Sequence, residues 1–297
     1  MGALDGRVAI ITGAGRGIGR EHALLFAAEG ARVVVNDLGG APDGSGADPT
    51  PAQQVVKEIL EAGGEAVVNG DDVTDGEGAD RLVQTALDAF GGLDVLVNNA
   101  GILRDRMLVN MTDEEFDDVT RVHLRGHFMP LRAAARFWKD QSKAGAEVRA
   151  SVINTASTSG LFGQPGQTNY GSAKSGIATM SIIAQMELER FGVRVNAICP
   201  AARTRLTEGL GGAEALSADG AFDPMDPANV SPFVAYLATA DCPIKGRAFF
   251  VYGGEVHLFQ PWALVDKIEV DHKWTLDELA EQGPRLAAYE FDLGKPY

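Results

Sequence analysis

Apolar runs of strand length alternate with amphipathic stretches along most of this chain. Residues 7–12 (RVAIIT) and 31–37 (ARVVVND) are rich in β-branched residues, as buried strands are, and a helical stretch, EHALLFAAEG, lies between them. The chain therefore opens as strand, turn, helix and strand, the unit that builds parallel sheets. Five further strands are predicted, in EAVVNG, LDVLVNNAG, RASVINTAS, GVRVNAICP and GRAFFVYGG.

Helices are predicted between these strands. Helical periodicity places them in PAQQVVKEILEAGG, in the second half of DDVTDGEGADRLVQTALDAFGG, and over 112–139, 169–191 and 227–238. Thr112 and Glu115 have the spacing of a capping box at the start of the first long helix. Because strands and helices alternate without an internal repeat, we predict an α/β fold. It is a doubly wound parallel sheet of the Rossmann type, with about seven strands and helices on both faces.

Three segments depart from this pattern. Residues 39–50 (GGAPDGSGADPT) have the composition of a loop insert. Residues 205–226 are rich in glycine and alanine with few large apolar residues, which suits a lid over a substrate. Residues 261–297 are polar with scattered aromatics, and they form a C-terminal extension that wraps the surface or contacts another subunit. We expect a single domain over residues 1–260 with this extension attached.

Charge and composition exclude several functions. The 297 residues carry a net charge of −15 without a basic stripe, which argues against nucleic-acid binding. No apolar run reaches the ~18 residues of a membrane helix and the N-terminus lacks a secretory pattern, so we expect a soluble cytoplasmic protein without membrane contact. The two cysteines form no CxxC pair and are expected to be buried thiols. His123 and His127 lie four residues apart without a third ligand, so no metal site is expected.

A glycine-rich turn joins the first strand to the first helix. It reads TGAGRGIG, with the spacing G-x-x-x-G-x-G. Glycines permit a tight turn and a close approach to a diphosphate, and the helix that follows offers free N–H groups. The position between a strand and a helix favours a dinucleotide site over a turn without a ligand. The expected contacts are Gly13, Arg16, Gly17, Ile18 and Gly19.

Polar residues end the next strands at the same edge of the predicted sheet. Asp37 can accept hydrogen bonds from the adenosine ribose hydroxyls and would repel a 2′-phosphate, which favours NAD over NADP. Arg16 could instead bind such a phosphate, and Asp37 could be a helix N-cap or a solvated acid. Further cofactor contacts are expected near the adenine ring and at the carboxyl end of the fourth strand, from Asp72, Val73, Asn99, Ala100 and Gly101.

Ser157, Tyr170 and Lys174 form the candidate catalytic set. Tyr170 and Lys174 are four residues apart on a predicted helix and share one face. The lysine charge and an oxidised nicotinamide ring lower the pKa of Tyr170, whose phenolate can then take the proton of a substrate alcohol while hydride leaves. Ser157 can hold the same substrate oxygen, and Tyr170 and Lys174 would also contact the cofactor. A nucleophilic serine is the rival chemistry, but no GxSxG elbow surrounds Ser157.

The motifs TGAGRGIG, NNAG and YGSAK, together with the serine, resemble the short-chain dehydrogenase/reductase family over about residues 5–255. The resemblance implies a Rossmann fold, a nicotinamide cofactor and a homodimer or homotetramer, with the two long helices forming subunit contacts in tetramers. VVVNDLGG, NNAGILRDRM, RVHLRGHF and NTASTSGLFGQPGQTNY are similar to the dehydrogenase part of peroxisomal multifunctional enzyme type 2 (17β-hydroxysteroid dehydrogenase type 4). This similarity implies oxidation of (3R)-3-hydroxyacyl-CoA with NAD, or of hydroxysteroids.

Three positions bear on the comparison with the family. His123 stands where most members have an asparagine that supports a water-linked proton path to the lysine, so it is either a candidate catalytic residue or a packing residue. Pro200 is followed by Ala201 instead of the usual glycine. Thr204 lies near where a hydroxyl could meet the nicotinamide carboxamide. Pro200 and Thr204 are therefore expected at the cofactor.

The substrate stays open at this point. Four arginines could offer positive charge to a CoA phosphate, or they could be solvated and ion-paired: Arg104, Arg106, Arg203 and Arg205. We expect an NAD-dependent dehydrogenase of a secondary alcohol, either a (3R)-3-hydroxyacyl-CoA or a hydroxysteroid. The alternatives are an NADPH-dependent 3-ketoacyl reductase, against which Asp37 speaks, and a non-catalytic dinucleotide-binding sensor, against which the intact catalytic set speaks.

Overall fold

The fold was analysed in a computed structural model that describes residues 2–41, 43–46, 48, 50–204 and 222–288. Within these ranges eight strands form one sheet in the order β3-β2-β1-β4-β5-β6-β7-β8. Neighbouring strands are parallel except for β7 and β8. The strands are β1 Val8–Thr12, β2 Arg32–Asn36, β3 Glu65–Asn69, β4 Val95–Asn98, β5 Ala150–Thr155, β6 Val193–Ala201, β7 Ala248–Tyr252 and β8 Glu255–Leu258. The predicted doubly wound parallel sheet is confirmed, and an antiparallel edge strand adds to it.

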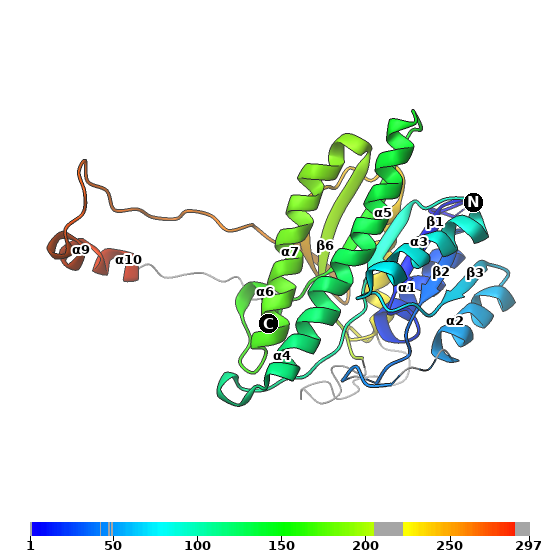
Figure 1. Ribbon diagram of the computed structural model, residues 1–297, viewed down its shortest axis with the longest axis horizontal. Coiled ribbons are helices and arrows are strands. Elements are labelled where there is room, and N and C mark those ends of the chain that lie inside the picture. The colour runs from blue at the N-terminus through cyan, green and yellow to red at the C-terminus, as the bar shows by residue number, and fades with distance from the viewer. Residues whose placement is uncertain (1, 42, 47, 49, 205–221, 289–297) are drawn as a thin grey trace. The chain divides into compact units, whose positions relative to one another are not determined.

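Helices pack on both faces of the sheet because its inner strands are apolar on both sides. In β1, Ile11 belongs to one buried cluster and Ile10 to the other, as the alternation of side chains along a strand requires. The first cluster includes Phe26 of α1, and the second includes Trp138 of α5. Figure 1 shows α3, α5 and α7 on the face nearest the viewer. The helices of the sheet unit are α1 Gly17–Ala28, α2 Thr50–Glu61, α3 Gly76–Phe90, α4 Asp113–Thr120, α5 Gly126–Lys143, α6 Thr158–Phe162, α7 Thr168–Leu188 and α8 Ser231–Ala238.

The first long helix is not continuous. The predicted capping box is present, because Thr112 Oγ1 accepts from the Glu115 N–H at 3.1 Å and Glu115 Oε2 accepts from the Thr112 N–H at 2.9 Å. Between α4 and α5, however, Arg121–Arg125 form a single π-helical stretch. Such π-helical turns are rare in proteins, and those that occur often lie at functional sites. This one contains His123.

The chain divides into two compact units, Met1–Leu258 and Phe259–Tyr297. The first unit holds the whole sheet and all of the candidate site residues. The second contains α9 Leu276–Gln282 and α10 Pro284–Ala287. Within it, Thr275 caps α9, and Arg285 pairs with Asp266 at 2.6 Å.

Candidate active site

The glycine turn has space for glycine alone at two of its positions. Gly13 has a φ of 62°, and a Cβ atom there would lie 2.7 Å from the Ala100 Cα. At Gly19, an added Cβ would lie 2.2 Å from the Gly13 carbonyl oxygen. Either substitution would force the backbone to move. The turn then enters α1 with no side-chain cap on the first N–H groups. These features fit a close approach of a dinucleotide diphosphate to bare backbone.

Thr12 and Asn99 hold the turn against the end of β4. The Thr12 hydroxyl accepts hydrogen bonds from the N–H groups of Asn99 at 2.9 Å and Ala100 at 3.1 Å. Asn99 Nδ2 in turn donates to the carbonyls of Thr12 and Gly13, both at 3.2 Å. Thr12 was missed as a site residue, although a hydroxyl at the carboxyl end of the first strand was a visible signal.

Asp37 follows β2 and closes the loop around the glycine turn. Its Oδ2 accepts from the Gly15 N–H at 2.7 Å, and its Oδ1 accepts from the Gly39 N–H at 2.6 Å. A carboxylate has about four acceptor sites, so this arrangement fixes the side chain and still leaves capacity for ribose hydroxyls. The nearby Arg16 helps to hold the pKa of Asp48 below its usual range, after the hydrogen bonds from Thr50. Arg16 therefore faces an acid of the insert.

The other expected cofactor residues lie along the same edge. Asp72 Oδ1 accepts from the Thr74 N–H at 2.8 Å, while Val73 is buried and packs in the core. Thr204, after β6, lies against the glycine turn, because a Cβ on Gly17 would be 3.4 Å from the Thr204 Cγ2. The remaining members of this set lie at element ends: Ile18 in the first turn of α1, Gly101 after β4, and Pro200 near the end of β6.

The three candidate catalytic side chains come together between β5, α6 and α7. Ser157 caps α6 and forms a side-chain hydrogen bond with Tyr170 that favours the phenolate. Lys174 is 2% exposed, donates to the Thr155 carbonyl, and places Nζ 5.5 Å from the centre of the Tyr170 ring. Helix α7 brings the tyrosine and lysine to one face, as their spacing predicted.

The electrostatics of this set differ from the expectation. Burial raises the pKa of Tyr170 to about 12, and the hydrogen bond from Ser157 offsets this only in part. Burial lowers the pKa of Lys174 itself to about 7, because a charged ammonium is poorly solvated there. Burial thus shifts the pKa of Tyr170 in the direction opposite to the effect expected from Lys174 and an oxidised nicotinamide ring, and that expected effect stays a prediction.

His123 lies beside the tyrosine. Its Nε2 is 2.8 Å from the Ile102 carbonyl oxygen, and its ring meets the Tyr170 ring edge to face with centroids 5.0 Å apart. The side chain is buried, and Nδ1 has no hydrogen-bond partner among the described residues. Burial first, and then the charge of Lys174, holds the pKa of His123 well below its usual value. His123 is therefore held neutral by its surroundings and packs against Tyr170.

The described arginines that were candidates for binding a CoA phosphate form ion pairs within the protein. Arg104 contacts Asp118 at 3.0 Å and Glu114 at 3.3 Å. Arg106 and Arg203 likewise pair, with carboxylates at 2.9 Å and 2.8 Å. The ion-paired alternative therefore describes these three. Arg205 and residues 205–221 of the expected lid lie outside the described residues.

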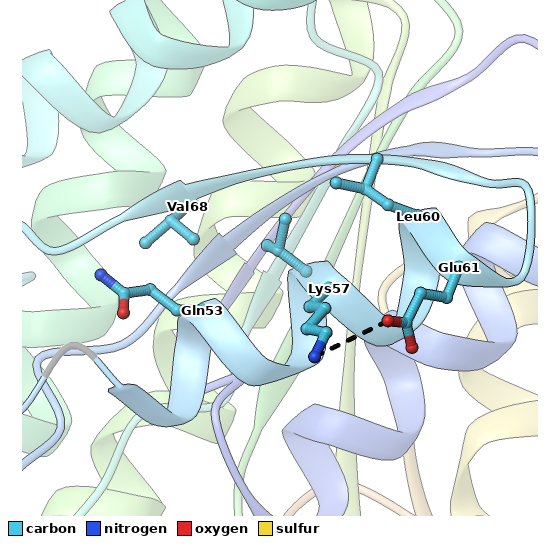
Figure 2. A pocket seen from close by; sticks show the side chains of 6 residues that line it. Gln53, Lys57, Leu60, Glu61 and Val68 are labelled. Carbon is cyan, nitrogen blue, oxygen red and sulfur yellow. Dashed lines mark ion pairs between the residues drawn. The ribbon is translucent and has the colours of Figure 1, made fainter.

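Other features of the molecule lie away from this site. An apolar hollow between α2 and β3 is lined by Val56, Leu60 and Val68, with the Lys57–Glu61 ion pair at its rim (Figure 2). It contains none of the candidate site residues. In the part of the chain that the structure describes, no three His, Cys, Asp or Glu side chains are grouped so that they could hold a metal ion. No helix among those residues is long and apolar enough to cross a membrane.

Comparison with known proteins agrees with this geometry. The family model for short chain dehydrogenase matches residues 7–211. Hydroxyacyl-CoA dehydrogenase ChsB1 of Mycobacterium tuberculosis is 43% identical over 284 residues, which cover 93% of this chain and 87% of that protein. Peroxisomal multifunctional enzyme type 2 of Drosophila melanogaster is 45% identical over 242 residues, which cover 82% of this chain but only 38% of that longer protein.

A solved structure extends the similarity to three dimensions. The crystal structure of a short chain dehydrogenase from Mycobacterium avium is 50% identical and superposes with a TM-score of 0.85. The match covers 96% of this chain and 95% of that one. The family binds an NAD(P) cofactor, and the glycine turn fits one. The chain therefore belongs to the short-chain dehydrogenase/reductase family, as an oxidoreductase that acts on CH–OH groups.

Proposed function

We propose that this protein is an NAD-dependent dehydrogenase that interconverts a secondary alcohol and a ketone, with Tyr170 as the general acid and base. The observation that carries the proposal is the grouping of Ser157, at the cap of α6, with Tyr170 and the buried Lys174 of α7, whose Nζ lies 5.5 Å from the tyrosine ring centre, at the sheet edge that also bears the glycine turn. A dinucleotide-binding sensor has no need of a proton acceptor at this position. The same set is what alcohol oxidation requires.

Each side chain has a distinct role in the proposed reaction. The Ser157 hydroxyl holds the substrate oxygen, and Tyr170 exchanges a proton with it. Bound NAD supplies the hydride acceptor and a positive charge that lowers the pKa of Tyr170. Lys174, whose pKa is about 7, takes up and releases protons near neutral pH, and the Thr155 carbonyl keeps its amine in place. His123 packs against the tyrosine and keeps its ring in position.

Asp37 supports NAD as the cofactor. Its carboxylate lies beside the glycine turn, where a 2′-phosphate would meet a like charge. The position of Asp48 near Arg16 adds a second acid at this end of the site. Titration of the protein with NAD and with NADP tests this part, and we expect the lower dissociation constant for NAD. A preference for NADP would favour the 3-ketoacyl reductase alternative.

For the substrate we propose a (3R)-3-hydroxyacyl-CoA thioester, with a hydroxysteroid as the second candidate. The names of the hydroxyacyl-CoA dehydrogenase and multifunctional enzyme relatives support the thioester. The ion-paired arginines do not add to this support. The test is NADH formation with both substrates side by side. Faster turnover of the thioester supports the first candidate, and turnover of the steroid alone would replace it with the second.

A homodimer or homotetramer built through the long helices is also proposed. Apolar side chains stand exposed on them, namely Phe128 on α5 and Ile182, Ile183 and Met186 on α7. Exposed apolar groups gathered in this way are typical of subunit contacts. Met186→Glu should lower the molar mass measured by sedimentation or light scattering, whereas Lys57→Glu, on α2, should leave it unchanged.

A further inference from the structure

The insert after β2 folds back on itself beside Asp37. The Gly39 N–H donates to Asp37 Oδ1 at 2.6 Å, and the Asp48 N–H donates to the Leu38 carbonyl at 3.1 Å. The two ends of the insert touch, because a Cβ on Gly39 would lie 1.6 Å from the Asp48 carbonyl oxygen. The ends of the insert, Gly39 and Asp48, are therefore held beside Asp37, the carboxylate that we propose binds the adenosine ribose.

The middle of the insert, at Asp43 and Gly44, rests on the loop after β4. Arg104 Nε donates to the Asp43 carbonyl at 2.9 Å. Gly44 lies against Ile102, since a Cβ on this glycine would be 3.0 Å from the Ile102 Cδ1. The insert thus spans from the proposed cofactor acid to the loop that precedes α4.

Arg104 also reaches the helix that carries Tyr170. Its guanidinium pairs with Asp118 and Glu114 of α4, and its side chain is 21% exposed. Its backbone carbonyl accepts from Asn169 Nδ2 at 2.9 Å. Asn169 is fully buried, and its Oδ1 accepts from the Tyr170 N–H at 2.7 Å. Two hydrogen bonds therefore separate Arg104 from the backbone of the proposed catalytic tyrosine.

We infer that Arg104 is a positioning residue that links the insert beside Asp37 to the placement of Tyr170. A guanidinium offers five donors in a rigid plane, so one side chain can hold the insert and α4 at once. A cofactor that orders the insert would then also hold the first turn of α7 in place. If the insert became disordered, that turn, and Tyr170 with it, would lose this support. The inference rests on the proposed function, because it takes Asp37 as the ribose ligand and Tyr170 as the acid and base.

The test compares Arg104→Gln with Arg106→Gln. Arg106 lies in the same loop and also pairs with α4, and within the described residues its side-chain hydrogen bonds go to Glu115 and not to the insert. Three quantities are measured on the full chain: the dissociation constant of NAD by titration without substrate, kcat and KM for the hydroxyl substrate, and the rate of protease cleavage within 39–50 with and without NAD. Thermal unfolding of each variant reports stability separately.

For Arg104→Gln we expect the dissociation constant of NAD to rise about tenfold and kcat to fall by about tenfold or more, since small misplacements at a reacting centre cost up to about 100-fold. NAD should also lose its protection of the insert, while Arg106→Gln keeps all three properties. If Arg104→Gln does not fold, Arg104→Lys, which retains the charge without the planar fork, takes its place with the same expectation.

Unchanged NAD affinity and kcat in a folded Arg104 variant would overturn the inference. So would losses matched by Arg106→Gln, because they would show a general effect of the loop. The NAD titration and the proteolysis need no turnover, so they still decide the link between Arg104 and the insert if the parent protein oxidises neither substrate. That last result would contradict the proposed function alone.

Discussion

The ring of His123 meets the ring of Tyr170 edge to face, with centroids 5.0 Å apart and planes at 88°. Gly101 makes this possible, because a Cβ there would lie 2.3 Å from the His123 Cε1. The glycine after β4 thus leaves space for a histidine of the π-helical turn. The histidine in turn supports the tyrosine.

Gly101→Ala should therefore act on the tyrosine through the histidine. The added methyl must push the His123 ring away, and overpacking of this kind costs about 1–3 kcal/mol of stability. We expect a lower kcat at saturating NAD, a condition that separates this effect from any loss of NAD binding at Gly101, which is also an expected cofactor contact. Gly92→Ala is the control, because a Cβ there meets nothing within 4 Å. Equal kcat for both variants would show that His123 does not position Tyr170.

Lys174 should give the unfolding free energy a distinctive pH dependence. Its pKa falls from 10.5 in the unfolded chain to about 7 in the folded protein. Between these values the unfolded chain binds a proton that the folded chain lacks, so the contribution of this group to stability rises with pH and is lowest below about 7. The stability of Lys174→Met relative to the parent should therefore increase as the pH falls from 10 to 7.

Urea unfolding at several pH values between 6 and 10 measures this trend. Lys57→Met, at an exposed position of α2, serves as the matched control and should not reproduce it. A constant difference between Lys174→Met and the parent over the whole range would show that Lys174 keeps its ordinary pKa in the folded protein.

The sheet and its order of elements could be predicted because each inner strand is a short, continuous apolar run. A surface helix would instead alternate apolar and polar residues with a period of 3.6. Ile10 and Ile11 face opposite clusters, and this double burial is what the run indicates. The edge strand β8 escaped prediction, since its four residues are all exposed and the alternation of Val256 and Leu258 with polar residues is too short to identify a strand. The π-helical turn at His123 was also invisible, because 3.6-residue periodicity continues on both sides of it.

The parts of the site that depend on the spacing of residues along a helix could be predicted from the sequence. The parts that depend on contacts between distant segments could not. Tyr170 and Lys174 share a helical face by their spacing alone. The rise in the pKa of Tyr170 depends on burial, which spacing does not reveal. The pairing of Arg104 with Asp118 joins a loop to a helix, and no local pattern indicated which of the many acids it would meet.

Thr12→Val should destabilise the protein and weaken the glycine turn. It removes the acceptor of two N–H groups, of Asn99 and Ala100, and an unsatisfied buried donor costs about 1–3 kcal/mol. We expect a lower free energy of unfolding and weaker NAD binding. Thr12→Ser keeps the hydroxyl and should recover most of both. Failure of serine to recover either property would assign the effect to the lost methyl packing.

Asp37→Asn should relax the choice of cofactor. The substitution removes the charge that opposes a 2′-phosphate but keeps an oxygen for the Gly15 N–H. Removal of one like charge at close range is worth about 1 kcal/mol or more, so the ratio of the NADP and NAD dissociation constants should fall by about tenfold. Glu65→Gln, an exposed acid of β3, is the control. An unchanged ratio of the two dissociation constants would show that Asp37 does not determine the preference for NAD over NADP.

The most direct test is the rate of NADH formation from NAD and a (3R)-3-hydroxyacyl-CoA by the parent protein and by Tyr170→Phe. Loss of the phenolic proton acceptor should lower kcat by about 10²–10⁴-fold while NAD still binds, because general acid–base catalysis contributes about that much. Turnover by the parent and its loss in the variant would support Tyr170 as the acid and base. Equal turnover by both proteins would contradict it.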